Sequence, residues 1–98
     1  MDAMIILKTD GSTETIPMSA TPGLEALQKG VGGYIELVPY FTELRGEPCQ
    51  VFCNEEGKLH SLPTNINATI LWQQQCSTVD VLVGDVVILL GAAMDTGE

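Results

Sequence analysis

Positive charge is what this sequence has least of. Four Lys and Arg residues stand against thirteen Asp and Glu residues, giving a formal net charge of −9 at pH 7. A domain with that balance repels phosphate backbones, so we do not expect it to bind DNA or RNA directly. Basic proteins, including nucleic-acid-binding proteins, are favoured as partners because opposite charges steer association.

Cysteine and long apolar runs are also scarce. The three cysteines are an odd number, which argues against a disulfide framework and is typical of a reducing cytoplasm. The longest apolar run, 86–94, is about half as long as the roughly 20 residues that a membrane-spanning helix needs. The first residues include an acid where a signal peptide requires positive charge. We therefore expect a cytoplasmic protein that does not bind membranes.

The alternation of apolar and polar residues predicts a single α+β domain over residues 1–98, with 91–98 as a flexible tail. The predicted order is β-β-α-β-β-β-α-β, which indicates a mixed sheet of about five to six strands with two helices. The apolar stretch 86–90 does not alternate, so we expect it inside the sheet with both faces covered. Strands are predicted at 4–9, 13–18, 34–41, 49–54, 58–62 and 79–90, and helices at 22–31 and 66–76. A break of the last strand at Gly84-Asp85 is an open alternative.

The first two predicted strands are joined at Asp10-Gly11, a pair typical of tight hairpins. Their register depends on the length of the loop. We prefer the register that places Lys8 opposite Glu14 and Ile6 opposite Ile16, because cross-strand pairs of like polarity stabilise a sheet.

Both helices carry end signals. Residues 21–22, Thr-Pro, predict the start of the first helix, and Gly32 or Gly33 its end. Thr64 or Asn65 can cap the second helix. That helix is expected to contact the sheet through Ile66, Ile70, and Trp72 or Leu71.

A second hairpin is predicted within 49–62, with its turn at 54–57. Its register places Cys49 and Cys53 on one face of a strand, about 13 Å apart, and His60 on the opposite face. A tetrahedral zinc ion cannot span that separation, so we expect core packing for the cysteines and no metal or other cofactor. The same geometry argues against a Cys53–His60 nucleophilic pair.

Three acidic residues raise the question of catalysis. Glu55 and Glu56 are neighbours in the predicted turn, where side chains point apart into water, so a solvated turn is favoured over an acid–base pair. Glu36 shares a strand face with Tyr34 and Val38. If that face is covered, the carboxylate must be hydrogen-bonded; if it is open, Tyr34 and Glu36 form a contact surface. The pattern leaves both alternatives open.

Three stretches carry a family resemblance: GGYIELV at 32–38, VFCNEEGKLHSLPTNINAT at 51–69 and VLVGDVVIL at 81–89. Together they resemble a family of small proteins with a domain of unknown function, carried by phages, plasmids and bacterial genomes. The resemblance implies a mobile-element origin and the cytoplasm of a host bacterial cell, and it supplies no reaction. The motif positions in this chain are Tyr34, Glu36, Asn54, Glu55, Gly57, Lys58, Leu62, Pro63, Asn65, Gly84 and Asp85.

We expect a non-enzymatic accessory protein of a phage or other mobile element, which binds a host or phage protein through an acidic surface. One alternative is a nucleic-acid-mimicking inhibitor of a host defence factor, of the anti-restriction or anti-CRISPR type. Another is a small-ligand or metal-dependent enzyme that uses Glu36, His60 and Asn65, and a third is a subunit that oligomerises through sheet edges. The candidate interaction surface consists of Tyr34, Glu36, Asn54, Glu55, Glu56, Lys58, His60 and Asn65.

Overall fold

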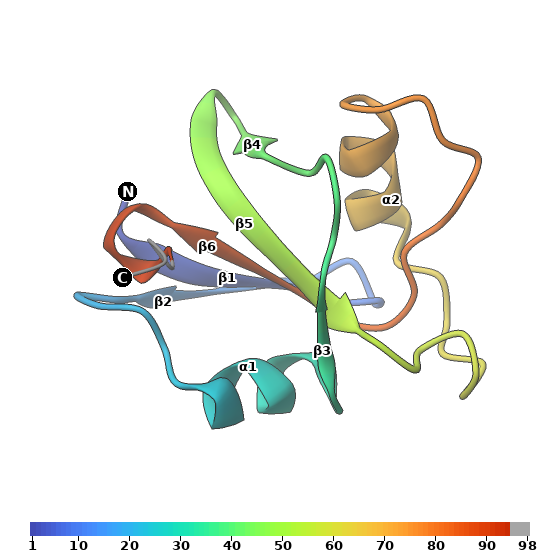
Figure 1. Ribbon diagram of the computed structural model, residues 1–98, viewed down its shortest axis with the longest axis horizontal. Helices are drawn as coiled ribbons and strands as arrows, with labels where there is room; N and C mark the ends of the chain where they lie inside the picture. Colours follow the sequence, from blue (N-terminus) through green and yellow to red (C-terminus); the bar gives the residue numbers. More distant parts are fainter. Residues whose placement is uncertain (95–98) are drawn as a thin grey trace.

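The computed structural model describes residues 1–94. It contains one six-stranded sheet with a helix on each side, so the α+β class is confirmed (Figure 1). The order β-β-α-β-β-β-α-β is also found, but with a strand at 43–44 in place of the predicted strand 58–62. Every strand pair is antiparallel, which corrects the expected mixed sheet. The elements are β1 (Ala3–Leu7), β2 (Thr13–Pro17), α1 (Leu24–Val31), β3 (Ile35–Leu37), β4 (Glu43–Leu44), β5 (Glu47–Asn54), α2 (Ile66–Gln73), β6 (Val86–Leu90) and the 3-10 helix η1 (Gly91–Ala93).

Strand β6 is the centre of the molecule. The strand order is β2-β1-β6-β5-β3, with β4 also paired to β5, and all five β6 residues are buried. Val86, Ile88 and Leu90 pack in the core beside α2, whereas Val87 and Leu89 pack in the core beside α1. Each such aliphatic side chain contributes roughly 1.5–3 kcal/mol by leaving water. The prediction that both faces of this strand are covered is confirmed.

The β1–β2 hairpin has a different register from the predicted one. Ile6 pairs with Glu14 rather than with Ile16, so the prediction is wrong by two residues. The loop is shifted by one residue, from 10–12 to 9–11: the Lys8 N–H donates to the Ser12 carbonyl at 2.9 Å, and the Asp10 carboxylate accepts hydrogen bonds from the backbone N–H and the hydroxyl of Ser12, at 2.8 and 2.6 Å. A shift of two residues keeps each side chain on its predicted face.

The second predicted hairpin does not form beyond its turn. The Gly57 N–H donates to the Asn54 carbonyl at 3.1 Å, as a tight turn requires, but 55–61 then continues as successive turns. The predicted strand 58–62 and its pairing of Phe52 with His60 are therefore wrong. Both edges of β5 are already occupied, because β6 pairs along one side and β3 and β4 along the other. No edge is left for residues 58–62.

A bulge separates β3 from β4. The Val38 N–H donates to the Val51 carbonyl at 2.8 Å, and the Cys49 N–H donates to the Thr42 carbonyl at 2.9 Å. Two more residues lie between these bonds on the β3–β4 side than on β5. The chain accommodates them with Tyr40 in the left-handed region, at φ 64°, which is an uncommon conformation for a non-glycine residue.

Helix α1 begins later than predicted. Its N-cap is Gly23, while the Thr21 hydroxyl donates to the Met94 carbonyl at 2.8 Å. The helix ends as predicted at Gly32, whose φ of 78° suits glycine. Met94 and the buried Ala93 pack beside this core, so the expected tail is wrong for 91–94, and 95–98 lie outside the described residues.

Helix α2 turns a different face to the sheet than predicted. Asn65 caps it, as one of the two alternatives proposed. Ile66 and Ile70 are 66% and 50% exposed, so the prediction that they contact the sheet is wrong. The predicted contact of Trp72 is confirmed, because this side chain is buried in the core, and the buried Ala68 takes the place of the two isoleucines. None of the helices within residues 1–94 is long and apolar enough to cross a membrane.

Candidate functional site

Two of the predicted surface residues are buried. Asn54 is 7% exposed and Asn65 is 1% exposed, so neither belongs to the exposed surface and the prediction is wrong for both. The Asn54 amide donates to the Val31 carbonyl at 3.3 Å, while its oxygen accepts from the Glu56 N–H at 2.8 Å. Asn54 therefore ties the end of α1 to the start of the turns after β5.

Asn65 joins three segments of the chain. Its side-chain oxygen accepts from the Ala68 N–H at 3.1 Å, which caps α2. Its amide nitrogen donates to the Leu7 carbonyl at 2.9 Å and to the Gly84 carbonyl at 3.0 Å. The residue is fully satisfied and buried, so its role in this fold is structural.

Close packing explains one of the motif glycines as well. A Cβ atom on Gly57 would lie 2.8 Å from the Val83 Cγ2 atom and 3.3 Å from the Asn54 carbonyl oxygen. Any side chain there would push the turn away from the 79–83 segment. Much of the motif therefore describes how this fold is assembled.

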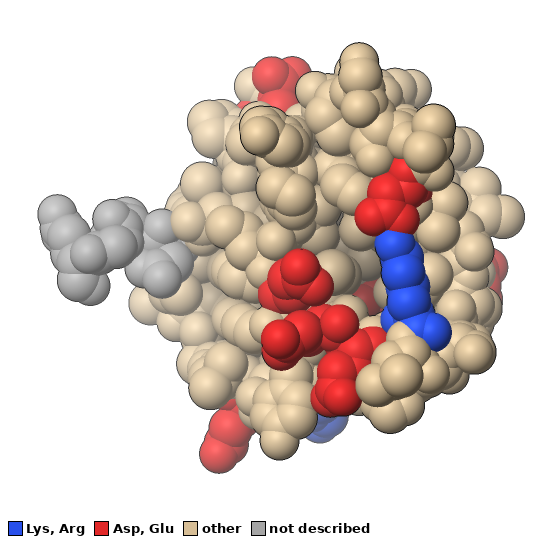
Figure 2. Space-filling view, turned by 45° about the vertical axis from the view of Figure 1, so that its right-hand side comes forward, with Lys and Arg blue, Asp and Glu red and all other residues tan. Residues whose placement is uncertain are grey.

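Three exposed members of the motif, Glu36, Glu55 and Lys58, line a cavity of about 250 Å³, which we name the acidic cavity. Glu36, Glu55, Lys58 and Asp80 are exposed on it, so three carboxylates surround one ammonium group. Figure 2 shows acidic side chains gathered on this face beside an extended basic one. The lining also includes the buried residues Val38, Asn54, Trp72 and Leu82 and the half-buried Cys53.

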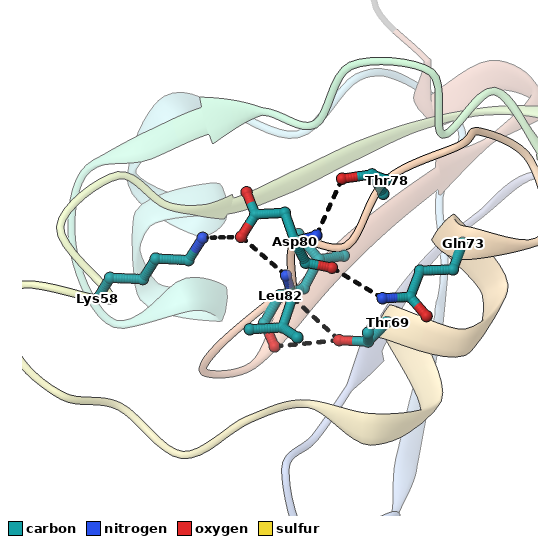
Figure 3. A network of polar contacts seen from close by, with 7 residues as sticks. Lys58, Thr69, Gln73, Thr78, Asp80 and Leu82 are labelled. Atoms are coloured by element: carbon teal, nitrogen blue, oxygen red, sulfur yellow. Dashed lines mark hydrogen bonds and ion pairs between the residues drawn. The ribbon is translucent and has the colours of Figure 1, made fainter.

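Lys58 and Asp80 form an ion pair across the acidic cavity from segments 22 residues apart in sequence. The Asp80 carboxylate also accepts the Val81 N–H at 2.8 Å, and the Asp80 N–H donates to the Thr78 hydroxyl at 3.0 Å (Figure 3). The hydrogen bond from Lys58, followed by that from Val81, lowers the pKa of the Asp80 carboxyl. Asp80 is consequently ionised at neutral pH, and it neutralises the only lysine or arginine of this cavity.

Segment 80–83, which forms the wall of the acidic cavity that carries Asp80, is anchored to α2. The Gln73 amide donates to the Asp80 carbonyl at 2.9 Å. The Thr69 hydroxyl accepts from the Leu82 N–H at 2.9 Å and donates to the Leu82 carbonyl at 3.3 Å (Figure 3). Side-chain hydrogen bonds from α2 therefore hold segment 80–83, which has a strand-like bridge only at Val83.

The remaining predicted residues lie elsewhere. Tyr34, Glu56 and His60 line a second cavity of about 230 Å³, which meets the acidic cavity at Asn54. Glu36 and His60 line different cavities, and Asn65 lines neither of these two. The structure does not bring together the three residues of the enzyme alternative.

Two of the three cysteines have raised pKa values. Cys49 is buried, and burial followed by the charge of Glu43 raises its pKa to about 11. Burial followed by the charge of Glu36 raises the pKa of Cys53 to about 11 as well. Both thiols are protonated at neutral pH and are weak nucleophiles. Within residues 1–94, no group of three or more His, Cys, Asp or Glu side chains is arranged to hold a metal ion.

Sequence reasoning did not find the partners that complete the acidic cavity. Asp80, Trp72 and Leu82 come from segments that are distant in sequence from Glu36 and Glu55. A possible signal was the single lysine at the turn, because a lone cation in an acidic chain favours a carboxylate partner. The sequence does not show which of the thirteen acids that partner is.

The family resemblance is supported by a comparison with family models. The model named Domain of unknown function (DUF3846) matches residues 1–98, so the chain belongs to this family. Neither the curated proteins nor the solved structures gave a match.

Proposed function

We propose that this member of the DUF3846 family is a non-enzymatic accessory protein of a phage or other mobile element, which binds a basic host or phage protein through the acidic cavity. One observation carries the proposal. Glu36 and Glu55 are exposed on the cavity, and neither forms an ion pair within residues 1–94. Unpaired carboxylates in such a position attract a basic surface and raise its rate of association.

Apolar side chains beside the acidic cavity support a protein as the partner. Tyr34 and Leu37, on either side of Glu36, are 63% and 56% exposed. Protein interfaces commonly surround an apolar or aromatic contact with a charged rim. Charge alone would give fast but weak binding, and these side chains supply area to bury.

The two main alternatives have less support. A nucleic-acid mimic needs a face of unbroken negative charge, yet Lys58 lies among the acids and neutralises Asp80. A small-ligand enzyme needs Glu36, His60 and Asn65 at one site, and these residues lie apart. Binding to a basic protein requires neither condition.

The test is affinity capture from the producing bacterium, followed by identification of the partner and measurement of its affinity with both proteins purified. The double variant Glu36→Gln/Glu55→Gln should weaken binding at about 0.1 M salt, and the difference should largely vanish at about 1 M salt, where the screening length falls from roughly 10 Å to 3 Å. The matched control is Glu14→Gln/Glu25→Gln. It removes the same formal charge from β2 and α1, away from α2, and differs from the test variant in that Glu14 is paired with Lys8 at 3.5 Å.

Equal loss of affinity in both double variants would mean that net charge drives binding and that the acidic cavity has no special role. If neither double variant nor the salt concentration changes the affinity, the proposal is refuted.

A further inference from the structure

Strand β3 is an edge strand, and its outer edge is unpaired within residues 1–94. It ends the strand order, and within residues 1–94 only β5 pairs with it. The Glu55 N–H donates to the Tyr34 carbonyl and the Val38 N–H to the Val51 carbonyl, both at 2.8 Å, so Tyr34 and Val38 direct their backbone groups toward β5. Backbone groups alternate in direction along a strand, so those of Ile35 and Leu37 face away from the sheet. An edge of this kind is a template for another strand.

The length of this edge is limited by α2. Pro39 is the next residue whose carbonyl faces outward, and the Trp72 indole N–H already donates to it at 2.7 Å. An added chain can therefore pair with Ile35 and Leu37 and must then leave the edge. The acidic cavity lies alongside, with 36–39 on one side and 80–83 on the other.

We infer that the unpaired edge of β3 binds an extended segment of a basic protein, which adds to the sheet as an antiparallel strand with the pattern apolar-basic-apolar. This inference rests on the proposed function and specifies the partner's chemistry. The basic residue lies opposite Glu36, where Cβ atoms of a cross-strand pair are about 4.5–5.5 Å apart. The two apolar residues lie opposite Ile35 and Leu37 and extend the face on which Leu37 is 56% exposed.

Charge decides between this partner and a second copy of the chain. Two β3 edges paired antiparallel about Glu36 would place one Glu36 carboxylate opposite the other, and like charges in that position destabilise a strand pair. Glu55 adds negative charge beside the same edge, whereas the charge of Asp80 is balanced by Lys58. A lysine or arginine opposite Glu36 is therefore attracted by the carboxylates of Glu36 and Glu55.

The experiment is an NMR titration of the full chain with the peptide Ser-Val-Lys-Val-Ser, blocked at both ends. The amide signals of Ile35 and Leu37 should shift and their hydrogen exchange should slow. In the antiparallel pair, the N–H groups of the two valines point toward β3 and that of the lysine points away. Methylating both valine nitrogens should weaken binding about tenfold or more, since two backbone hydrogen bonds are lost.

Two matched ligands act as controls and leave the protein unchanged. Methylating the lysine nitrogen alone should change affinity by less than about threefold, because its N–H makes no bond to the sheet. Replacing the lysine with glutamate should abolish binding. The Glu36→Gln variant should weaken binding of the original peptide without altering the effect of valine methylation.

The possible failures are distinguishable. If valine methylation has no effect while Glu36→Gln still weakens binding, strand addition is refuted and capture by charge survives. If the glutamate peptide binds as well as the lysine peptide, both the strand inference and the role of the acidic cavity are refuted. If no amide signal shifts even at millimolar peptide, the strand inference alone is refuted. The capture experiment tests the proposed function independently.

Discussion

Within the stretch 54–65, the two asparagines and the two exposed charged residues differ in almost every physical respect. Asn54 and Asn65 are buried, and each bonds backbone groups on two or more segments. Glu55 and Lys58 are exposed on the acidic cavity, and within residues 1–94 only Lys58 has an ion-pair partner. All four lie on motif positions. Motif membership therefore does not separate residues that build the fold from residues available to a partner, whereas burial and hydrogen bonding do.

The largest effect is expected at Asn65. Replacing it with Ala removes the cap of α2 and leaves the carbonyls of Leu7 and Gly84 without their donor, so the free energy of unfolding should fall by about 2–4 kcal/mol. Urea unfolding followed by circular dichroism measures the loss. Asn67→Ala, at an exposed position two residues along, is the control and should stay within about 0.5 kcal/mol of the parent. A loss below about 1 kcal/mol at Asn65 would contradict its structural role.

Asn54 should show a smaller loss. Asn54→Ala removes the bond to the Val31 carbonyl and the bond from the Glu56 N–H, which should cost about 1–3 kcal/mol and speed hydrogen exchange at the Glu56 amide. Glu55→Gln, its neighbour in the turn, should leave stability within about 0.5 kcal/mol. An equal loss of unfolding free energy in the two variants would contradict the distinction between the buried and the exposed residues of this stretch.

Cys49 and Cys53 extend the contrast to reactivity. A pKa of about 11 leaves roughly one thiol in a thousand ionised at about pH 8. Alkylation of both should therefore be about a hundredfold slower in the folded chain than in urea, as read by mass spectrometry of the labelled peptides. The raised pKa favours the protonated thiol in the folded state. The stabilisation is fully present below pH 9.0 and should be lost as pH rises from 9.0 through about 11.

The smallest effect is expected at the Lys58–Asp80 ion pair. Both side chains are more than half exposed, so a double-mutant cycle with Lys58→Met and Asp80→Asn should give a coupling below about 1 kcal/mol. Because the pKa of Asp80 is lowered, the stabilising contribution is present above the ordinary value of 3.8 and lost as pH falls below it. An NMR titration of the Asp80 carboxyl carbon follows that loss. A coupling well above this limit would make the pair a structural element instead.

Local chemistry predicted much of the fold. The end of α1 at Gly32 and the Asn65 cap depend on a few neighbouring residues, as does the apolar strand β6. Competition between distant segments was not predictable. The turn at 54–57 is compatible with a hairpin, but β3, β4 and β6 occupy both edges of β5 before residues 58–62 can pair.

The hairpin that does form, and that the sequence did not predict, joins β4 to the N-terminal end of β5. Arg45 and Gly46, with φ values of 51° and 84°, form the two-residue turn between β4 and β5 inside a segment predicted to be a loop. The backbone has the signs of a type I′ turn, which favours Asn-Gly and rarely uses arginine. For the site, the sequence indicated Glu36, Glu55 and Lys58, whereas Asp80 joined them only through the packing of 79–83.

The place of β6 sets when the molecule can fold during its synthesis. The last strand within residues 1–94 is the one that joins β1 to β5, so the β1–β2 hairpin and the β3–β5 unit have no shared strand until Leu90 has left the ribosome. Strand partners so far apart in sequence also make closure slow, because the intervening chain must be ordered before the contacts form. Until β6 is available, a nascent chain lacks the strand that joins these two units, and their apolar faces stay exposed to chaperones and proteases.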